Sequence, residues 1–144
     1  MRVFRIAAIG GDGIGPEVLD CGIRCLDAVA ELEGFQFDFQ YFPWGSDYFR
    51  KHGEMMPKNA LDTLCDFDAI YFGAVGDPEI PDDVTLWGLR IAICQGFGLY
   101  ANVRPAFKLP GLLGPLRSDL GDQVDWVVIR ENSEGEYAGI GGRS

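Results

Sequence analysis

The stretch AAIGGDGIGPEV at residues 7–18 constrains the fold of this chain more than any other feature. A short apolar run enters a glycine cluster, and Pro16 and Glu17 follow before apolar residues recur with a helical period. Proline suits the first turn of a helix, and the helix dipole stabilises an acidic side chain there. The stretch therefore predicts a strand at residues 3–9 buried on both faces, a tight turn, and a helix that ends near Gly34. We expect the apolar stripe of this helix to contain Val18, Leu19, Leu26 and Val29.

Strand and helix signals alternate along the rest of the chain. Residues 35–41 alternate between apolar and polar side chains, which predicts a strand with one wet face, and residues 68–75 predict a second buried strand. Further expected elements are helices at 57–64 and 86–97, an extended segment at 100–105, a long connection at 106–122 and a strand at 124–130. This order predicts an α/β fold with a mainly parallel sheet and flanking helices.

The charge balance and the cysteine spacing narrow the choice of partner and compartment. The 144 residues carry 22 acidic and 12 basic side chains, a net charge of −10. Such a surface repels phosphate backbones and anionic lipids, so we expect no nucleic acid and no membrane as partner. The four cysteines lack the spacing of a disulfide framework, which favours free, buried thiols in a reducing cytoplasm.

The glycine turn fits neither of the two common phosphate-binding patterns. A dinucleotide fingerprint needs glycines at its first, third and sixth positions, and counting from Gly11 reaches Pro16 at the sixth. A P-loop needs a lysine followed by serine or threonine, which this stretch lacks. Two interpretations stay open: a helix N-terminus whose backbone N–H groups face an anion, and a tight connection with no ligand.

Three arginines and one tyrosine are the candidates for chemistry. Arg90, Arg104 and Arg130 lie near the ends of predicted elements, where ligands of open α/β sheets bind. Two guanidinium groups that converge there would bind a small di- or tricarboxylate, whereas the alternative is that each pairs with a surface carboxylate. Tyr137 follows Arg130 by seven residues and is either a general acid beside a cation or a half-buried tyrosine in a polar turn.

Three motifs taken together resemble the metal-dependent β-decarboxylating dehydrogenases, which are the isocitrate/isopropylmalate dehydrogenase family. They are GGDGIGPEV at 10–18, YANVRP at 100–105 and VVIRENSEGEYAGIGGR at 127–143. The last motif, with TLWG at 85–88, is most similar to the tartrate/D-malate dehydrogenase branch. The resemblance implies an isopropylmalate dehydrogenase-like fold, incomplete in this chain. Residues 1–100 would begin a large first domain, and residues 101–144 would begin a second.

The resemblance also implies a reaction: oxidation of a small 2-hydroxy acid by NAD, then loss of a carboxyl group with the help of Mg²⁺ or Mn²⁺. It implies that Arg104 and Arg130 hold the carboxylates of a hydroxy-dicarboxylate, and that Tyr137 is the acid of the last step. The metal ligands are expected beyond residue 144, so the chain alone should be inactive. A homodimer is implied for the full-length protein.

By the same resemblance, the cofactor cleft is lined by Ile14, Ala74 and Thr85. One departure from the family pattern concerns a third arginine, which the family has where this sequence has Cys94. Arg90 lies four residues earlier, on the same face of a helix. We hypothesise that Arg90 replaces the missing cation or reads a polar substituent of the substrate. Either role favours a small polar substrate.

Several alternatives stay open at this point. Within the family, the enzyme could act on 3-isopropylmalate or isocitrate instead of tartrate or D-malate. Outside enzymes, the chain could be a truncated, non-catalytic module that binds a carboxylate or a partner protein. The choice between NAD and NADP also stays open, because the segment that discriminates between them in the family is not among these residues.

Overall fold

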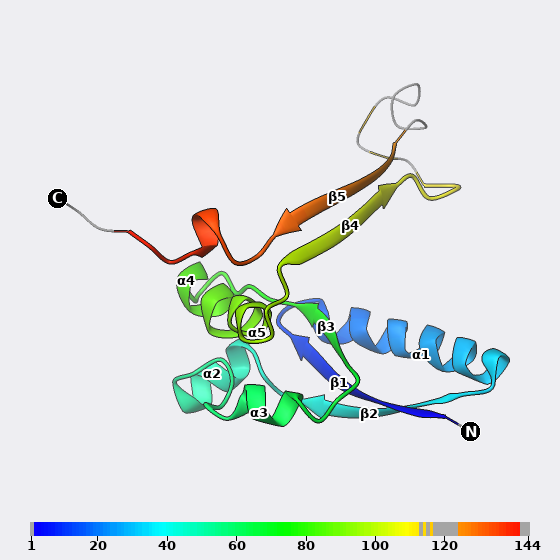
Figure 1. The fold of residues 1–144 in the computed structure, drawn as a ribbon, viewed down its shortest axis with the longest axis horizontal. Helices are drawn as coiled ribbons and strands as arrows, with labels where there is room; N and C mark the ends of the chain where they lie inside the picture. The colour runs from blue at the N-terminus through cyan, green and yellow to red at the C-terminus, as the bar shows by residue number, and fades with distance from the viewer. Residues whose placement is uncertain (1, 113, 115, 117–123, 142–144) are drawn as a thin grey trace. The chain divides into compact units, whose positions relative to one another are not determined.

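The computed structural model describes residues 2–112, 114, 116 and 124–141, and the chain divides into two compact units, Met1–Phe97 (unit 1) and Gly98–Ser144 (unit 2) (Figure 1). Unit 1 contains β1 (Val3–Gly11), α1 (Gly15–Glu33), β2 (Gln36–Phe42), α2 (Ser46–His52), α3 (Ala60–Leu64), β3 (Ala69–Ala74), α4 (Asp82–Thr85), the π-helical turn η1 (Leu86–Ile91) and α5 (Ala92–Gly96). Unit 2 contains β4 (Ala101–Phe107), β5 (Asp125–Glu131) and the 3-10 turn η2 (Gly135–Tyr137).

The strands of unit 1 form a parallel sheet, as the sequence predicts, and β1 lies in its middle. β1 pairs with β2 on one side and with β3 on the other, in the order β2-β1-β3. β1 runs two residues beyond the predicted strand, because Gly11 still pairs with Ala74. The carboxyl ends of the three strands therefore meet at one edge, where the glycine turn lies.

The sheet separates two apolar clusters, because successive side chains of a strand point to opposite faces. Ala8 of β1 packs with Leu19 and Ile23 of α1 on one face. The larger cluster on the other face joins the sheet to α3, η1 and α5 and consists of Ala7, Ile9, Trp44, Met55, Ala60, Leu64, Leu89 and Ile93. Figure 1 shows α1 along one side of the sheet and α2 and α3 on the other.

Helix α1 begins and ends as predicted, but its buried face differs from the predicted one. Pro16 lies in the first turn, and Gly34 closes the helix in the left-handed conformation with its N–H donated to the Ala30 carbonyl. The buried residues are Gly15, Leu19, Ile23 and Ala30. Val18 and Val29 are 53% and 48% exposed, so the prediction that they face the core is wrong. Steps of four residues from Gly15 leave both valines on the wet side.

Other expectations for unit 1 also need correction. β3 is only partly buried along its length, and the first three residues of β1 are not fully buried, so neither strand is buried throughout. Helix α2 was not expected, because residues 46–52 show no clear apolar period. The predicted helix at 86–97 begins earlier, with α4, and contains the π-helical turn η1. Three of the four free cysteines are exposed rather than buried: Cys21, Cys25 and Cys65.

Unit 2 is built around an antiparallel ribbon of β4 and β5, which confirms the extended segment and the last strand expected from the sequence. Most of the apolar side chains that the structure describes in this unit are exposed, for example Val103 at 59%, Trp126 at 60% and Ile129 at 68%. The predicted connection at 106–122 lies largely outside the described residues. Within the described residues, no helix of the chain is long and apolar enough to cross a membrane.

Candidate functional site

The glycines of the turn between β1 and α1 have two separate tasks. Gly11 and Gly13 have φ angles of 70° and 56°, which glycine adopts without strain. A Cβ atom added to Gly11 would overlap the Ala74 carbonyl oxygen, whereas one added to Gly13 would meet nothing within 4 Å. Gly11 therefore allows β3 to approach closely, and Gly13 lies on the open side of the turn.

The turn packs backbone against backbone on the end of β3. A Cβ atom on Gly15 would lie 2.7 Å from the Ala74 nitrogen, and one on Gly73 would lie 2.8 Å from the Gly15 carbonyl oxygen. The Asp12 N–H donates to the Ala74 carbonyl oxygen at 2.7 Å. The side of the turn that faces β3 is therefore tightly packed. On the opposite side, Ile14 is 69% exposed.

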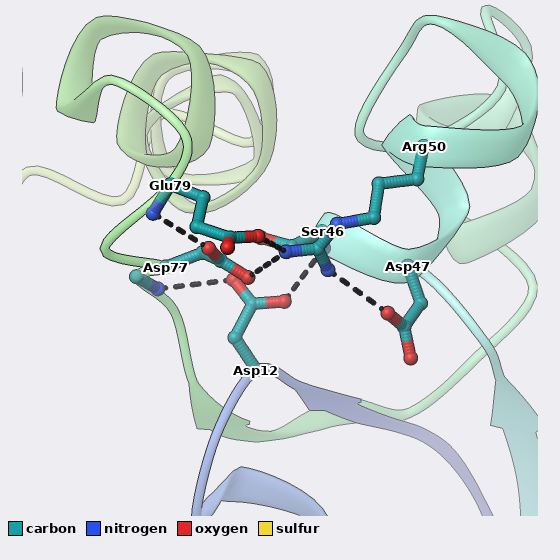
Figure 2. A network of polar contacts seen from close by, with 7 residues as sticks. Asp12, Ser46, Asp47, Arg50, Asp77 and Glu79 are labelled. Atoms are coloured by element: carbon teal, nitrogen blue, oxygen red, sulfur yellow. Dashed lines mark hydrogen bonds and ion pairs between the residues drawn. The ribbon is translucent and has the colours of Figure 1, made fainter.

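Asp12 is the residue of this turn that the sequence interpretation missed. Its side chain is buried, with the residue 8% exposed. One carboxylate oxygen accepts the Ser46 N–H at 2.6 Å, and the other accepts the Gly76 N–H at 3.0 Å. Figure 2 shows the carboxylate between the start of α2 and the segment that follows β3. We call this carboxylate, with its bonds to the Ser46 and Gly76 N–H groups, the Asp12 clamp. The only local feature of the sequence that indicates it is an acidic residue between two glycines at the end of a strand.

Arg50 also holds the segment at residues 75–81, which joins β3 to α4. The Arg50 guanidinium donates to Asp77 at 2.7 Å, to Glu79 at 3.2 Å and to Asp47 at 3.0 Å (Figure 2). Asp77 also accepts the Glu79 backbone N–H at 2.9 Å. The hydrogen bond from the Glu79 N–H is the main cause that lowers the pKa of Asp77, and Arg50 lowers it further. The hydrogen bond to Asp77 in turn raises the pKa of Arg50. The Arg50 side chain is 42% exposed and that of Asp77 14%, so solvent and salt reach this pair from the Arg50 side and screen part of its attraction.

The three residues predicted to line the cofactor cleft all belong to unit 1, in different surroundings. Ile14 is exposed at the start of α1, and Ala74 ends β3 with its carbonyl bonded to Asp12. Thr85, at the end of α4, is fully buried, and its hydroxyl has no hydrogen-bond partner among the described residues. Leaving a buried hydroxyl unsatisfied is costly, so this atom is a candidate for a partner from outside the described part of the chain.

A groove of about 660 Å³ opens on the other side of the turn, toward β2. Its lining includes Gly10, Trp44, Tyr48 and His52, and the centres of the Tyr48 and His52 rings, which are tilted by 33°, lie 4.2 Å apart. Neither Ile14 nor Ala74 lines it. The groove is therefore separate from the cleft that the sequence predicts.

Arg90 lies in the π-helical turn η1 and is half-buried, as is Cys94 in α5. Leu89 and Ile93, one position earlier in each case, are 0% and 5% exposed and face the core. Ile91, on the other side of Arg90, is 4% exposed as well, so Arg90 lies between two core residues and is itself only half-buried. Turns of π-helix are rare and frequently occur at functional sites.

Arg104 and Arg130 share one face of the ribbon in unit 2. Arg130 of β5 lies opposite Asn102 of β4, and Arg104 is two residues further along β4. Opposite residues and residues two apart in a strand point to the same face, so the two arginines are diagonal neighbours. Such neighbours are roughly 7–8 Å apart. The register thus brings together two residues that sequence spacing alone could not connect.

Tyr137 lies beside Arg130, with the guanidinium carbon 4.9 Å from the centre of the tyrosine ring. Glu131 organises the turn between them, because its carboxylate accepts the Ser133 N–H at 2.9 Å and the Glu134 N–H at 2.6 Å. Asn132 is buried and donates to the Leu99 carbonyl at 3.1 Å. The sequence interpretation named the tyrosine but missed both residues that hold its turn.

Among the described residues, no group of three or more His, Cys, Asp or Glu side chains could hold a metal ion. The geometry offers instead two cationic side chains on one ribbon face, a tyrosine beside one of them, and an open glycine turn in unit 1.

Comparison with known proteins adds to this geometry. A family model for isocitrate/isopropylmalate dehydrogenase matches residues 5–143. A probable tartrate dehydrogenase/decarboxylase from Agrobacterium vitis is 57% identical over 145 residues, covering 100% of this chain and 40% of the relative. The decarboxylating D-malate dehydrogenase of Escherichia coli strain K12 is 48% identical, covering 99% of this chain and 40% of the relative.

A solved structure agrees in fold. The crystal structure of isocitrate dehydrogenase from Methylococcus capsulatus superposes with a TM-score of 0.74 at 31% identity, covering 97% of this chain and 37% of that one. The predicted α/β fold is thereby confirmed. The chain spans about two-fifths of the length of the curated relatives named above.

Proposed function

The chain belongs to the isocitrate/isopropylmalate dehydrogenase family, and we propose that it is the N-terminal part of an NAD-dependent, divalent-metal-dependent enzyme that oxidises and decarboxylates a small 2-hydroxy acid of the tartrate or D-malate type. The observation that carries the proposal is the match over the whole chain to a tartrate and a D-malate relative, at 57% and 48% identity. The isocitrate dehydrogenase structure, at 31%, is more distant. This difference favours the tartrate/D-malate branch over isocitrate.

We propose that unit 1 begins the large domain of this enzyme and that unit 2 begins its second domain. The change of unit between Phe97 and Gly98 supports this division and lies close to the boundary of 100 and 101 expected from the sequence. A homodimer and a cytoplasmic location complete the proposal for the full-length protein. The homodimer is an expectation from the family resemblance, and the cytoplasmic location is an expectation from the cysteine spacing.

Arg104 and Arg130 are the proposed binding groups for the substrate carboxylates. Their common face on the ribbon supports this role, because two guanidinium groups on one side can each form paired hydrogen bonds to a carboxylate. Arg90, in η1 of unit 1, is the proposed third cation. It would either take the place of the arginine that the family has at the position of Cys94, or contact the C3 hydroxyl that tartrate has where 3-isopropylmalate has its isopropyl group.

Tyr137 is the proposed general acid. In the last step its hydroxyl gives a proton to the carbon from which carbon dioxide has left. The Arg130 guanidinium beside the ring would stabilise the negative charge left on the tyrosine oxygen. Glu131 would keep the tyrosine in place through the turn that precedes η2.

The nicotinamide cofactor is proposed to bind on the open side of the glycine turn. Free space beside Gly13 and the exposed Ile14 support this site, with the Ala74 backbone as its inner wall. Thr85 is proposed as a further residue of the cleft on the family resemblance. When bound, the cofactor accepts a hydride from the substrate. The divalent cation is proposed to use ligands outside the described residues.

The proposal is tested with the longer polypeptide in which this segment extends to the length of its relatives. Turnover is measured with tartrate, D-malate, 3-isopropylmalate and isocitrate, each with NAD or NADP and with Mn²⁺ or a chelator. We expect NAD reduction with tartrate or D-malate that the chelator abolishes. Preference for 3-isopropylmalate or isocitrate would move the enzyme to another branch. No turnover of any of the four would favour a non-catalytic module.

A further inference from the structure

We propose that Asp12 is a positioning residue of the cofactor cleft, which fixes the distance between the glycine turn and the segment at residues 75–81. The inference rests on the proposed function, because that function puts the cofactor between Ile14 and Ala74. It assigns a task to the one acidic residue of the turn. That residue would act through the backbone, without touching the cofactor.

The first support is the number of segments that Asp12 holds. Its carboxylate accepts N–H groups from Ser46 and Gly76, and its own N–H donates to the Ala74 carbonyl oxygen. Its carbonyl oxygen accepts the Gly15 N–H at 2.8 Å. One residue therefore joins the start of α1, the start of α2 and the end of β3, at the carboxyl ends of all three parallel strands (Figure 2).

The second support is the backbone that the carboxylate holds. Gly76 has a φ angle of 141°, and a Cβ atom there would meet nothing within 4 Å. A glycine in open space has no side chain to restrict it, so its position depends on its backbone bonds. Next to it, Val75 packs against the large apolar cluster, and Arg50 holds Asp77. The Asp12 bond closes the gap between these two anchors.

The expected consequence is weaker cofactor binding, with the chemical step left nearly intact. A site that is already ordered loses less conformational entropy when a ligand binds. Without the carboxylate bonds, the backbone at Gly76 would move relative to the glycine turn, and cofactor binding would have to restore its position, whereas Ala74 would stay paired with β1. The groups proposed for proton transfer and carboxylate binding on the ribbon, Tyr137, Arg104 and Arg130, do not depend on this spacing.

Asp12→Asn is the informative variant, because it keeps the shape of the side chain. An amide has one oxygen, so it can accept only one of the two N–H groups, and its NH₂ group faces the other donor. Asp47→Asn is the matched control. It makes the same chemical change on a side chain that is 90% exposed and bonds only to Arg50 among the described residues.

The experiment measures steady-state kinetics of the longer polypeptide and amide hydrogen exchange of the 144-residue chain. For Asp12→Asn we expect the KM for NAD to rise about tenfold, as loss of a charged hydrogen bond allows, with kcat and the hydroxy-acid KM changed less than about threefold. Exchange at the Gly76 amide should rise at least tenfold. Asp47→Asn should match the wild type in every measurement.

Each other outcome has a distinct meaning. If the wild type is active and Asp12→Asn leaves the NAD KM unchanged, or lowers kcat and both KM values alike, the positioning role is wrong. If the Gly76 amide stays as protected as in the wild type, the clamp itself is wrong. If the wild type oxidises no hydroxy acid, the proposed function falls, and the cofactor part of the inference falls with it. The exchange experiment would still decide whether the clamp exists.

Discussion

Two carboxylates in this chain each accept two backbone N–H groups, and they organise their regions differently. The donors to Asp12 in unit 1 lie 34 and 64 residues away, whereas the donors to Glu131 in unit 2 lie two and three residues away. Asp12 therefore connects separate segments in a buried place, and Glu131 shapes its own turn. The same chemical group serves tertiary packing in one unit and local conformation in the other.

Among the variants that disrupt the long-range contacts around Asp12, Gly11→Ala has the largest expected effect. The new Cβ atom would overlap the Ala74 carbonyl oxygen at a φ angle of 70°, so β3 would have to move from the turn that carries Asp12. We expect more than about 4 kcal/mol of lost stability, or failure to fold, in urea unfolding followed by circular dichroism.

Gly13→Ala is the control for that variant. It has a similar φ angle of 56° but open space around the Cβ position, so about 1–2 kcal/mol of left-handed strain is expected. Equal losses for the two variants would show that conformation alone, rather than close approach to β3, makes the turn need its glycines.

The direct form of the comparison replaces each carboxylate with alanine. Asp12→Ala leaves the buried Ser46 N–H without a partner and removes the part-buried bond to the Gly76 N–H, so we expect about 1–3 kcal/mol of lost unfolding free energy. Glu131→Ala leaves the Ser133 and Glu134 N–H groups to bond to water, so we expect a loss of only about 0.5–1 kcal/mol of unfolding free energy. Urea midpoints of the two variants measure the difference. Equal losses would mean that the long-range clamp adds nothing beyond a local turn.

A kinetic experiment on Glu131 tests whether its local role differs from that of Asp12. If Glu131 holds the turn before Tyr137, Glu131→Ala in the longer polypeptide should lower kcat about tenfold and leave the NAD KM within about twofold. This pattern is the reverse of the one expected for Asp12→Asn. A change in the NAD KM with unchanged kcat would separate Glu131 from the proton-transfer step.

These contrasts also mark what the sequence could predict. The strand, turn and helix of residues 3–34 depend on neighbours a few residues apart, and proline, glycine and apolar spacing record such neighbours. The Asp12 clamp depends on Ser46 and Gly76, whose positions follow only from the parallel pairing of three strands. Local periodicity contains no information about that pairing.

The candidate site divides in the same way. Motifs single out Arg104 and Arg130, but only the antiparallel register puts them on one face of the ribbon. The exposed positions of Val18 and Val29 show the same limit, because both valines fit a helical stripe and the face that is buried depends on Tyr71 and Ala8 of the sheet. A period identifies a helix, and the sheet selects which side of it is buried.

The smallest expected effect concerns Arg50, the exposed counterpart of the buried Asp12 clamp. Because the pKa of Asp77 is lowered in the folded chain from the ordinary value of 3.8, its ionised form stabilises the fold above that value. This contribution is lost as the pH falls below 3.8 toward the lowered pKa.

Asp77→Asn should therefore lower the urea midpoint slightly at about pH 6 and leave it unchanged at about pH 2. Salt near 1 M should shrink the difference at the higher pH, since exposed ion pairs are screened. A salt-independent loss would mean that Asp77 acts through its hydrogen bond to the Glu79 N–H, and that the segment at 75–81 owes its place to backbone bonds at both ends.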